Sequence, residues 1–289
     1  MNKKSIFLIV PFLLLNSVVI IAALFKAIQV SFGYYPVVGM TTWTTEYFQQ
    51  VLTSQYFQSS IFYSLYLAIT ATVFSIVFGL ALAFIIMKSK SRWFQKILQI
   101  PIAMPHLIVT LMVMQMISQS GIISRIFFQI GVISDINQFP LLIHDQGGFG
   151  ILLVFLYKEI PYVAVATLAI LKQMQFGYLE VAKNLGASPR QAFFKVTLPL
   201  IQPTLATLYI ILFCFVFASF EVPYLLGSPR HETIAVTAYQ LFNQVDLTTR
   251  PQAFALNLIM SAICLLVSFL TLLVSRLLPG GHGGGLNEE

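Results

Sequence analysis

The chain alternates between long runs of apolar residues and short polar segments that hold most of its charges. A helix needs about 20 apolar residues to cross the roughly 30 Å hydrocarbon core of a bilayer. Runs of that length predict six membrane-spanning helices, at about residues 5–25, 61–87, 97–117, 149–171, 204–226 and 254–278. The pattern therefore predicts an all-α polytopic membrane protein.

The two ends of the chain need separate interpretation. Residues 5–25 form an uncharged stretch too long for a typical signal-peptide core, and no clear small-residue cleavage site follows it. We expect it to be a retained first span. Residues 1–278 are predicted to form a single membrane domain, and the Gly-rich residues 279–289 a flexible cytoplasmic tail.

Composition supports the membrane class. Hydrophobic types make up 58% of the chain and charged residues 9%, whereas a soluble domain carries about 25% charged residues. The net charge of +6 is explained by membrane topology, and we expect no nucleic-acid partner. The four histidines are scattered and no Cys or His metal-binding pattern occurs, so we expect no metal site.

Lys and Arg residues set the orientation, because cytoplasmic loops carry an excess of both. With the N-terminus in the cytoplasm, the cytoplasmic side collects most of them, including the cluster at 88–96 and those at 183–195. Both termini and the segment 178–200 are therefore predicted to face the cytoplasm. The loops at 31–40 and 118–148 then lie outside, where they are candidates for contact with an external protein.

The cytoplasmic segment has clear helix boundaries. A first helix is predicted from about Tyr178 to Leu185, with Gly186 at the position where a left-handed residue commonly ends a helix. Ser188 is the expected N-cap of a second helix, with Pro189 at its first position and Gln191 completing a capping box. We expect that helix to end near Pro199, because a proline disfavours helix in the residue before it.

At these residues the segment resembles a known family. Glu180, Ala182, Gly186, Leu198 and Pro199 match, at the right spacing, the cytoplasmic EAA loop of permease subunits of binding-protein-dependent type I ABC importers. Val181 and Val196 stand where the pattern has Ala and Ile. The resemblance implies a six-helix permease fold, with the cytoplasmic coupling helix between spans four and five. Among such permeases the chain looks most similar to the group for polyamines, ferric iron and thiamine.

In that family the EAA loop docks on a cytoplasmic ABC ATPase dimer. The resemblance implies an ATPase-coupling role for Glu180, Ala182, Gly186, Ala187, Ser188, Pro189, Arg190, Phe193, Lys195, Leu198 and Pro199. It also implies a second permease subunit, identical or related, an extracytoplasmic solute-binding protein, and a place in a bacterial inner membrane. The chain has no GxxxxGK[ST] phosphate loop, so we expect no enzyme activity or cofactor here, and ATP with Mg²⁺ in the partner ATPase.

The solute pathway is suggested by ionisable and aromatic residues within predicted spans. The candidates are Tyr157, Glu159, Tyr162, Phe220, Glu221 and Tyr224. Lys158 and Glu159 are adjacent and point about 100° apart on a helix, so they do not pair well with each other. Glu221 is expected inside span five, near its outer end. Structural interhelical contacts for both acids, and packing for the aromatic residues, remain open alternatives.

The two intramembrane acids favour a cationic solute. We expect a polyamine-like cation or ferric iron ahead of thiamine, phosphonate or sulfate. An alternative is an ion-coupled secondary transporter in which Glu159 carries a proton. A membrane-embedded enzyme would need a convergent cluster of acid, base and metal ligands near one membrane face, and the sequence shows no such cluster.

Overall fold

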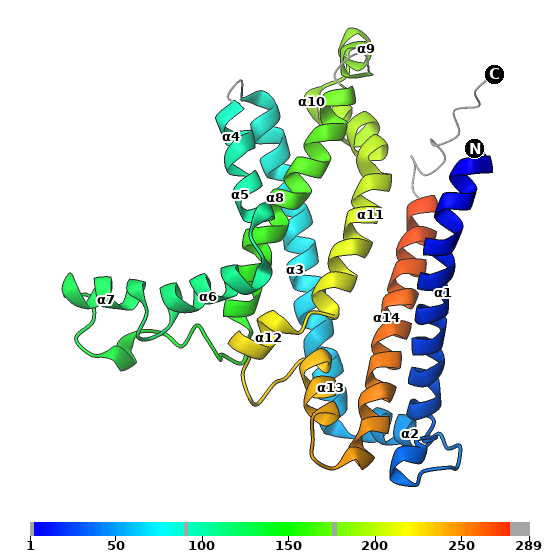
Figure 1. Ribbon diagram of the computed structural model, residues 1–289. Helices are drawn as coiled ribbons and strands as arrows, with labels where there is room; N and C mark the ends of the chain where they lie inside the picture. Colours follow the sequence, from blue (N-terminus) through cyan, green and yellow to red (C-terminus); the bar gives the residue numbers. More distant parts are fainter. Residues whose placement is uncertain (1–2, 90–91, 175–177, 278–289) are drawn as a thin grey trace. The chain divides into compact units, whose positions relative to one another are not determined.

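The computed structural model describes residues 3–89, 92–174 and 178–277, and every regular element in these ranges is helical (Figure 1). The predicted tail at 279–289 lies outside the described residues. The helices are α1 Lys3–Ser31, α2 Glu46–Thr53, α3 Gln55–Lys88, α4 Arg92–Ile97, α5 Gln99–Ala103, α6 His106–Ile117, α7 Ile122–Gln129, α8 Phe149–Met174, α9 Tyr178–Asn184, α10 Pro189–Ala192, α11 Leu198–Phe217, α12 Glu221–Leu226, α13 Ile234–Phe242 and α14 Arg250–Leu277. Short 3-10 turns lie at Pro36–Val38, Ile136–Gln138 and Leu247–Thr249, and a π-helical turn covers Phe193–Thr197.

Within the described residues, six helical segments are long and apolar enough to cross a membrane. They are Val10–Ser31, Gln55–Lys88, His106–Gln129, Phe149–Lys172, Pro189–Phe217 and Leu247–Leu277. The number matches the prediction, and the fourth segment lies close to its predicted range. The second segment starts six residues earlier than predicted, while the third and fifth differ in ways that bear on function.

The chain forms two compact units, each described here by itself. The first unit comprises the described residues up to 61 together with 234–262. Its polar contacts join segments far apart in sequence. Arg250 Nη1 donates to the Tyr35 hydroxyl at 2.8 Å, and the Ser60 and Thr237 hydroxyls lie 3.1 Å apart. These contacts fasten the beginning of α14 to the loop after α1, and α13 to the beginning of α3.

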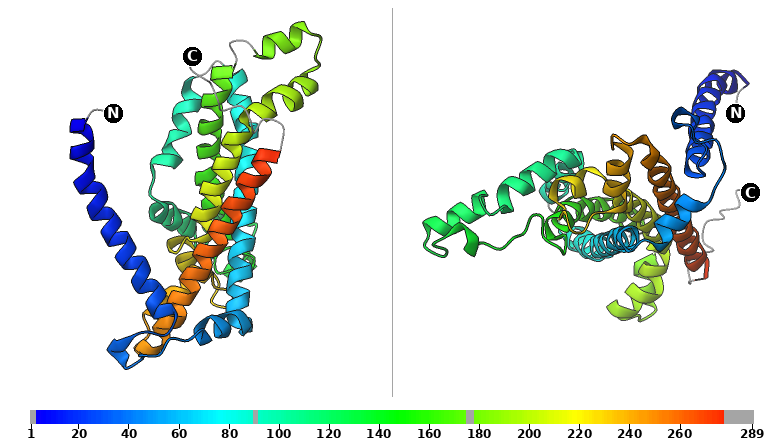
Figure 2. Two further views of the ribbon diagram at one scale, coloured as in Figure 1. Left: turned by 90° about the vertical axis from the view of Figure 1, so that its right-hand side faces the viewer. Right: turned by 90° about the horizontal axis from the view of Figure 1, so that it is seen from below.

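The second unit comprises residues 62–233 and the described residues after 262, and its core is a bundle of α3, α8 and α11 (Figure 2). Buried Ala83, Ile86, Leu168, Leu171 and Ile201 pack together between these three helices. Gly79 allows α3 to approach α8 closely, because a Cβ at this position would lie 2.6 Å from the Cβ of Val163. Small residues at such crossings allow the close backbone packing on which membrane helices depend.

The predicted third span, residues 97–117, is not one helix. Helix α5 ends at Ala103, Met104 is extended with ψ 134°, and α6 begins at His106. Pro105 causes the break, because its ring disfavours a helical conformation in Met104. Beyond the break, α6 and α7 extend to one side of the second unit, across the direction of α8 (Figures 1 and 2).

The predicted fifth span, residues 204–226, is also corrected. Helix α11 ends at Phe217, and Glu221 begins the separate short helix α12. Pro223 explains the interruption: it would remove a hydrogen bond from a continuous helix, whereas the first turn of α12 needs no donor there. Glu221 is therefore exposed at the start of α12 and does not lie inside a span.

The expected helix end near Pro199 is wrong. Helix runs from Pro189 through the π-helical turn Phe193–Thr197 into α11, as one segment of 29 residues. In this turn the Leu198 N–H donates to the Phe193 carbonyl five residues back. The wider turn lies directly before Pro199, which lacks an N–H, and such turns accommodate a proline without ending the helix.

Candidate functional site

The predicted coupling segment is shaped by two local devices. Gly186 follows α9 with φ +79°, and the Ala187 N–H donates to the Ala182 carbonyl at 3.0 Å. A left-handed residue in this place ends a helix and allows the chain to reverse. Ser188 then caps α10: the Gln191 N–H donates to Ser188 Oγ, and the Ser188 N–H donates to Gln191 Oε1. Both predicted boundaries are confirmed.

The members of the predicted coupling set differ in exposure. Ser188, Pro189, Arg190 and Lys195 are exposed, Ala187, Phe193, Leu198 and Pro199 are half-buried, and Ala182 is buried. The side chain of Glu180 lies outside the described part of the chain. The Phe193 ring packs edge-on against Phe84 of α3, with centroids 5.4 Å apart. A surface available to a partner is thus backed by a contact with the helix bundle.

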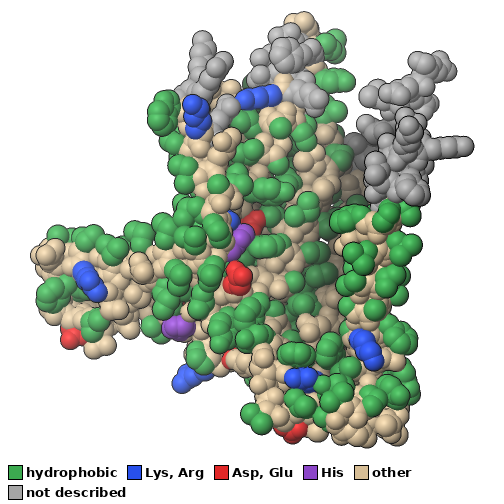
Figure 3. Space-filling view, viewed as in Figure 1, with side chains coloured by type: hydrophobic (Ala, Val, Ile, Leu, Met, Phe, Trp, Pro, Cys, Tyr) green, Lys and Arg blue, Asp and Glu red, His purple; other side chains and the backbone are tan. Residues whose placement is uncertain are grey.

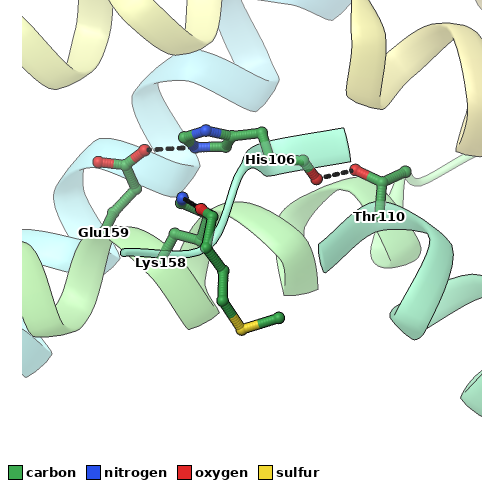
Figure 4. A network of polar contacts seen from close by, with 5 residues as sticks. His106, Thr110, Lys158 and Glu159 are labelled. Carbon is green, nitrogen blue, oxygen red and sulfur yellow. Dashed lines mark hydrogen bonds and ion pairs between the residues drawn. The ribbon is translucent and has the colours of Figure 1, made fainter. Parts of the chain in front are cut away.

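A second polar group lies inside the membrane-spanning part of the second unit. Lys158 and Glu159 of α8 are 8% and 5% exposed. The Lys158 ammonium donates to the backbone carbonyl of Met104, the residue that follows the end of α5 (Figure 4). A carbonyl at a helix end has no partner within its helix. Lys158 therefore stabilises the break in the third span.

Glu159 faces the other side of the same break. Its Oε1 lies 3.8 Å from Nε2 of His106, the first residue of α6 (Figure 4). This distance is too long for a hydrogen bond, and the contact is an ion pair only when His106 is protonated. The His106 ring also packs against Phe215 of α11, with centroids 4.7 Å apart. The break thus brings α6, α8 and α11 together around one carboxylate.

These groups line a cavity of about 270 Å³. Its lining residues are Ile102, His106, Lys158, Glu159, Tyr162, Ile211, Leu212 and Phe215. Figure 3 shows a small group of basic, acidic and histidine side chains on this face of the second unit, where hydrophobic side chains otherwise predominate. Within the described residues, no group of three or more His, Cys, Asp or Glu side chains could hold a metal ion.

The predicted pathway residues fall into two groups. Glu159 and Tyr162 line the cavity, whereas Tyr157 is exposed elsewhere on α8. Glu221 and Tyr224 lie on α12, where Tyr224 stacks on Phe220 with centroids 4.9 Å apart, and none of these three lines the cavity. Sequence reasoning missed His106 and Phe215. The prolines at 101 and 105 were the available signal for His106, because they mark an interruption beside it.

Comparison with known proteins places most of the chain in one family. The family described as binding-protein-dependent transport system inner membrane component matches residues 75–278. The inner membrane ABC transporter permease protein YdcU of Escherichia coli (strain K12) is 37% identical over 87 residues, which are 30% of this chain and 28% of that protein. The thiamine transport system permease protein ThiP of Haemophilus influenzae is 26% identical over 224 residues, or 76% of this chain and 40% of that protein. The chain therefore matches less than half the length of these two relatives.

Solved structures show the same fold. A crystal structure of a bacterial ABC transporter involved in the import of the acidic polysaccharide alginate superimposes with a TM-score of 0.74 at 21% identity, covering 95% of this chain and 97% of that chain. The same kind of transporter in complex with an alginate pentasaccharide-bound periplasmic protein gives a TM-score of 0.73 at 21% identity, covering 94% and 95% of the two chains. Other relatives are named for ferric, sulfate and spermidine/putrescine transport systems. The chain belongs to the binding-protein-dependent transport system inner membrane component family, as the permease subunit of an ABC importer.

Proposed function

We propose that this permease passes a small cationic solute, delivered by an external binding protein, across the bacterial cytoplasmic membrane. A separate cytoplasmic ABC ATPase dimer supplies the energy, with ATP and Mg²⁺ bound there. A second permease subunit, identical or related, completes the pathway, and both termini face the cytoplasm. The distribution of Lys and Arg supports this orientation.

The observation that carries the proposed coupling is the continuity of the coupling segment with the fifth span. The capped turn at Ser188 leads through the π-helical turn into α11 without a break, as helix Pro189–Phe217. A force applied to exposed Arg190 or Lys195 therefore acts directly on a membrane-spanning helix. Gly186 lets α9 and α10 form a corner at the end of this lever.

The cationic solute is supported by the buried carboxylate of Glu159 and by relatives named for spermidine/putrescine and ferric transport. Relatives named for thiamine and sulfate transport keep those solutes, and phosphonate, as less favoured members of the proposal. We rank a polyamine-like cation or ferric iron first. An intramembrane acid is costly unless it serves a pathway or a structural pair.

Affinity purification of the tagged chain in mild detergent tests the proposal. We expect a nucleotide-binding subunit to co-purify, and the purified complex to hydrolyse ATP. Uptake by membrane vesicles should then require ATP inside and the matching binding protein outside. Robust uptake by this chain alone, driven by a proton gradient without ATP, would instead favour an ion-coupled transporter using Glu159.

A further inference from the structure

We propose that the cavity beside Glu159 is a binding site for an organic ammonium group of the solute, with the Glu159 carboxylate as its counter-ion. This site rests on the proposed function and narrows it to amine-bearing solutes. The argument concerns the charge that Glu159 presents, its depth along the helix, and the walls of the cavity.

Glu159 keeps its charge for a ligand because its neighbour is engaged elsewhere. Lys158 donates to the Met104 carbonyl across the break between α5 and α6. The two adjacent side chains of α8 leave the helix about 100° apart, so Lys158 cannot satisfy that carbonyl and also pair closely with Glu159. The broken span thus separates a lysine from an acid that would otherwise neutralise it.

The protein leaves the carboxylate incompletely paired. Glu159 is only 5% exposed, and its ion-pair partner His106 lies 3.8 Å away, beyond hydrogen-bond distance. His106 Nε2 is itself buried without a hydrogen-bond partner. A buried carboxylate with so little compensation is costly. A cation entering the cavity would supply the missing charge.

The position along α8 suits a pathway. Glu159 is ten residues after Phe149, the first residue of α8, which corresponds to about 15 Å at 1.5 Å per residue. This depth is about half of a hydrocarbon core of roughly 30 Å. Solute sites in other membrane transporters commonly lie near the midplane where a helix is interrupted, and the Met104–Pro105 break is such an interruption.

The walls favour an organic cation over a metal ion. Tyr162, His106 and Phe215 offer aromatic faces, which attract ammonium groups, and Ile211 and Leu212 offer apolar surface for a hydrocarbon chain. The volume of about 270 Å³ is close to the lower bound of about 300 Å³ for small-molecule sites. One carboxylate and one imidazole are too few ligands for a metal-ion cage.

Cysteine labelling in membrane vesicles containing the whole importer tests the site, with putrescine as the probe. Ile211→Cys on the cavity wall is introduced into a chain that also carries Cys214→Ser and Cys264→Ser. We expect putrescine to slow the reaction of this cysteine with a maleimide at least threefold. Butane-1,4-diol, which has the same chain length without charge, should have no effect.

Two further variants locate the charge. Glu159→Gln should abolish the protection by putrescine, while Glu221→Gln, which changes an exposed acid on α12 outside the cavity, should leave it intact. Equal protection by the diol and putrescine would overturn the site, and this comparison needs no substitution at Glu159. Protection that persists in Glu159→Gln would also overturn it. If the ATPase co-purifies but labelling fails to respond, only the site is wrong; if no ATPase co-purifies, the proposed function itself is wrong.

Discussion

The ammonium of Lys158 donates a hydrogen bond to the backbone carbonyl of Met104, a residue 54 positions earlier in the chain (Figure 4). This contact joins the middle of α8 to the end of α5, where Pro105 interrupts the third span. A buried lysine that would be costly alone and a buried carbonyl without a helical partner satisfy each other. The interruption is therefore a stable part of the fold.

Lys158→Met should destabilise the protein. The substitution keeps an apolar side chain of similar length but leaves the Met104 carbonyl without its donor, at a cost of about 1–3 kcal/mol. Unfolding of the detergent-solubilised protein by a graded denaturant measures the change. The control is Lys26→Met on an exposed position of α1, which should change the unfolding free energy by less than about 0.5 kcal/mol. Equal unfolding curves for the two variants would show that Lys158 does not hold the break.

The break also shows why the sequence predicted the spans better than their interruptions. Apolar residues continue on both sides of Met104 and of Ala218, so hydropathy alone reads one span in each place. Prolines did not resolve the ambiguity: Pro105 and Pro223 accompany breaks, while Pro161 and Pro203 lie inside continuous helices. What stabilises the first break is a side chain more than fifty residues away, which no local pattern reports.

The coupling corner was predictable because its determinants are local. Gly186 and the capping box of Ser188 and Gln191 act within a few residues of chain, so their spacing in the sequence carries the structure. The site around Glu159 was only partly predictable for the opposite reason. His106 and Phe215 reach it from α6 and α11, and their meeting with α8 depends on tertiary packing.

Gly186→Val should weaken coupling to the ATPase. A Cβ at this position would meet nothing within 4 Å, so the substitution acts through the backbone alone, at φ +79°. A β-branched residue is strained in this left-handed region, by roughly 1–2 kcal/mol or more. We expect less ATPase in the affinity-purified complex and a lower rate of ATP hydrolysis per permease.

Gly39 provides a matched control for this prediction. It has φ +80° and equally open space around its Cβ position, but it follows the 3-10 turn Pro36–Val38, far from the coupling segment in sequence. Gly39→Val should therefore carry similar backbone strain while leaving ATPase recovery unchanged. Equal recovery of ATPase with the two variants would contradict a coupling role for the corner at Gly186.

Gly79→Ala should destabilise the bundle, although alanine is the better helix former. Helix propensity alone predicts a gain of up to about 1 kcal/mol for replacing a glycine in the interior of α3. The new Cβ would, however, lie 2.6 Å from the Cβ and 2.7 Å from a Cγ of fully buried Val163 on α8. Overpacking of this kind costs about 1–3 kcal/mol. Denaturant unfolding should therefore show a loss of stability, and a gain would mean that α3 and α8 are not held at this distance.

Phe193→Leu should uncouple ATP hydrolysis from transport more than Phe194→Leu. The Phe193 ring contacts Phe84 of α3 at 5.4 Å between centroids, whereas Phe194 is 55% exposed on the adjacent position. Because the π-helical turn is wider than an α-helical one, the side chain of Phe193 is what holds this turn against the bundle. Loss of that contact should raise the number of ATP molecules hydrolysed per solute imported in reconstituted vesicles. Phe84→Leu should produce the same defect, and the double variant Phe84→Leu/Phe193→Leu should be no worse than either single change, because both remove one shared contact. Additive defects would indicate that the two rings act independently, and that movement reaches α3 by another route.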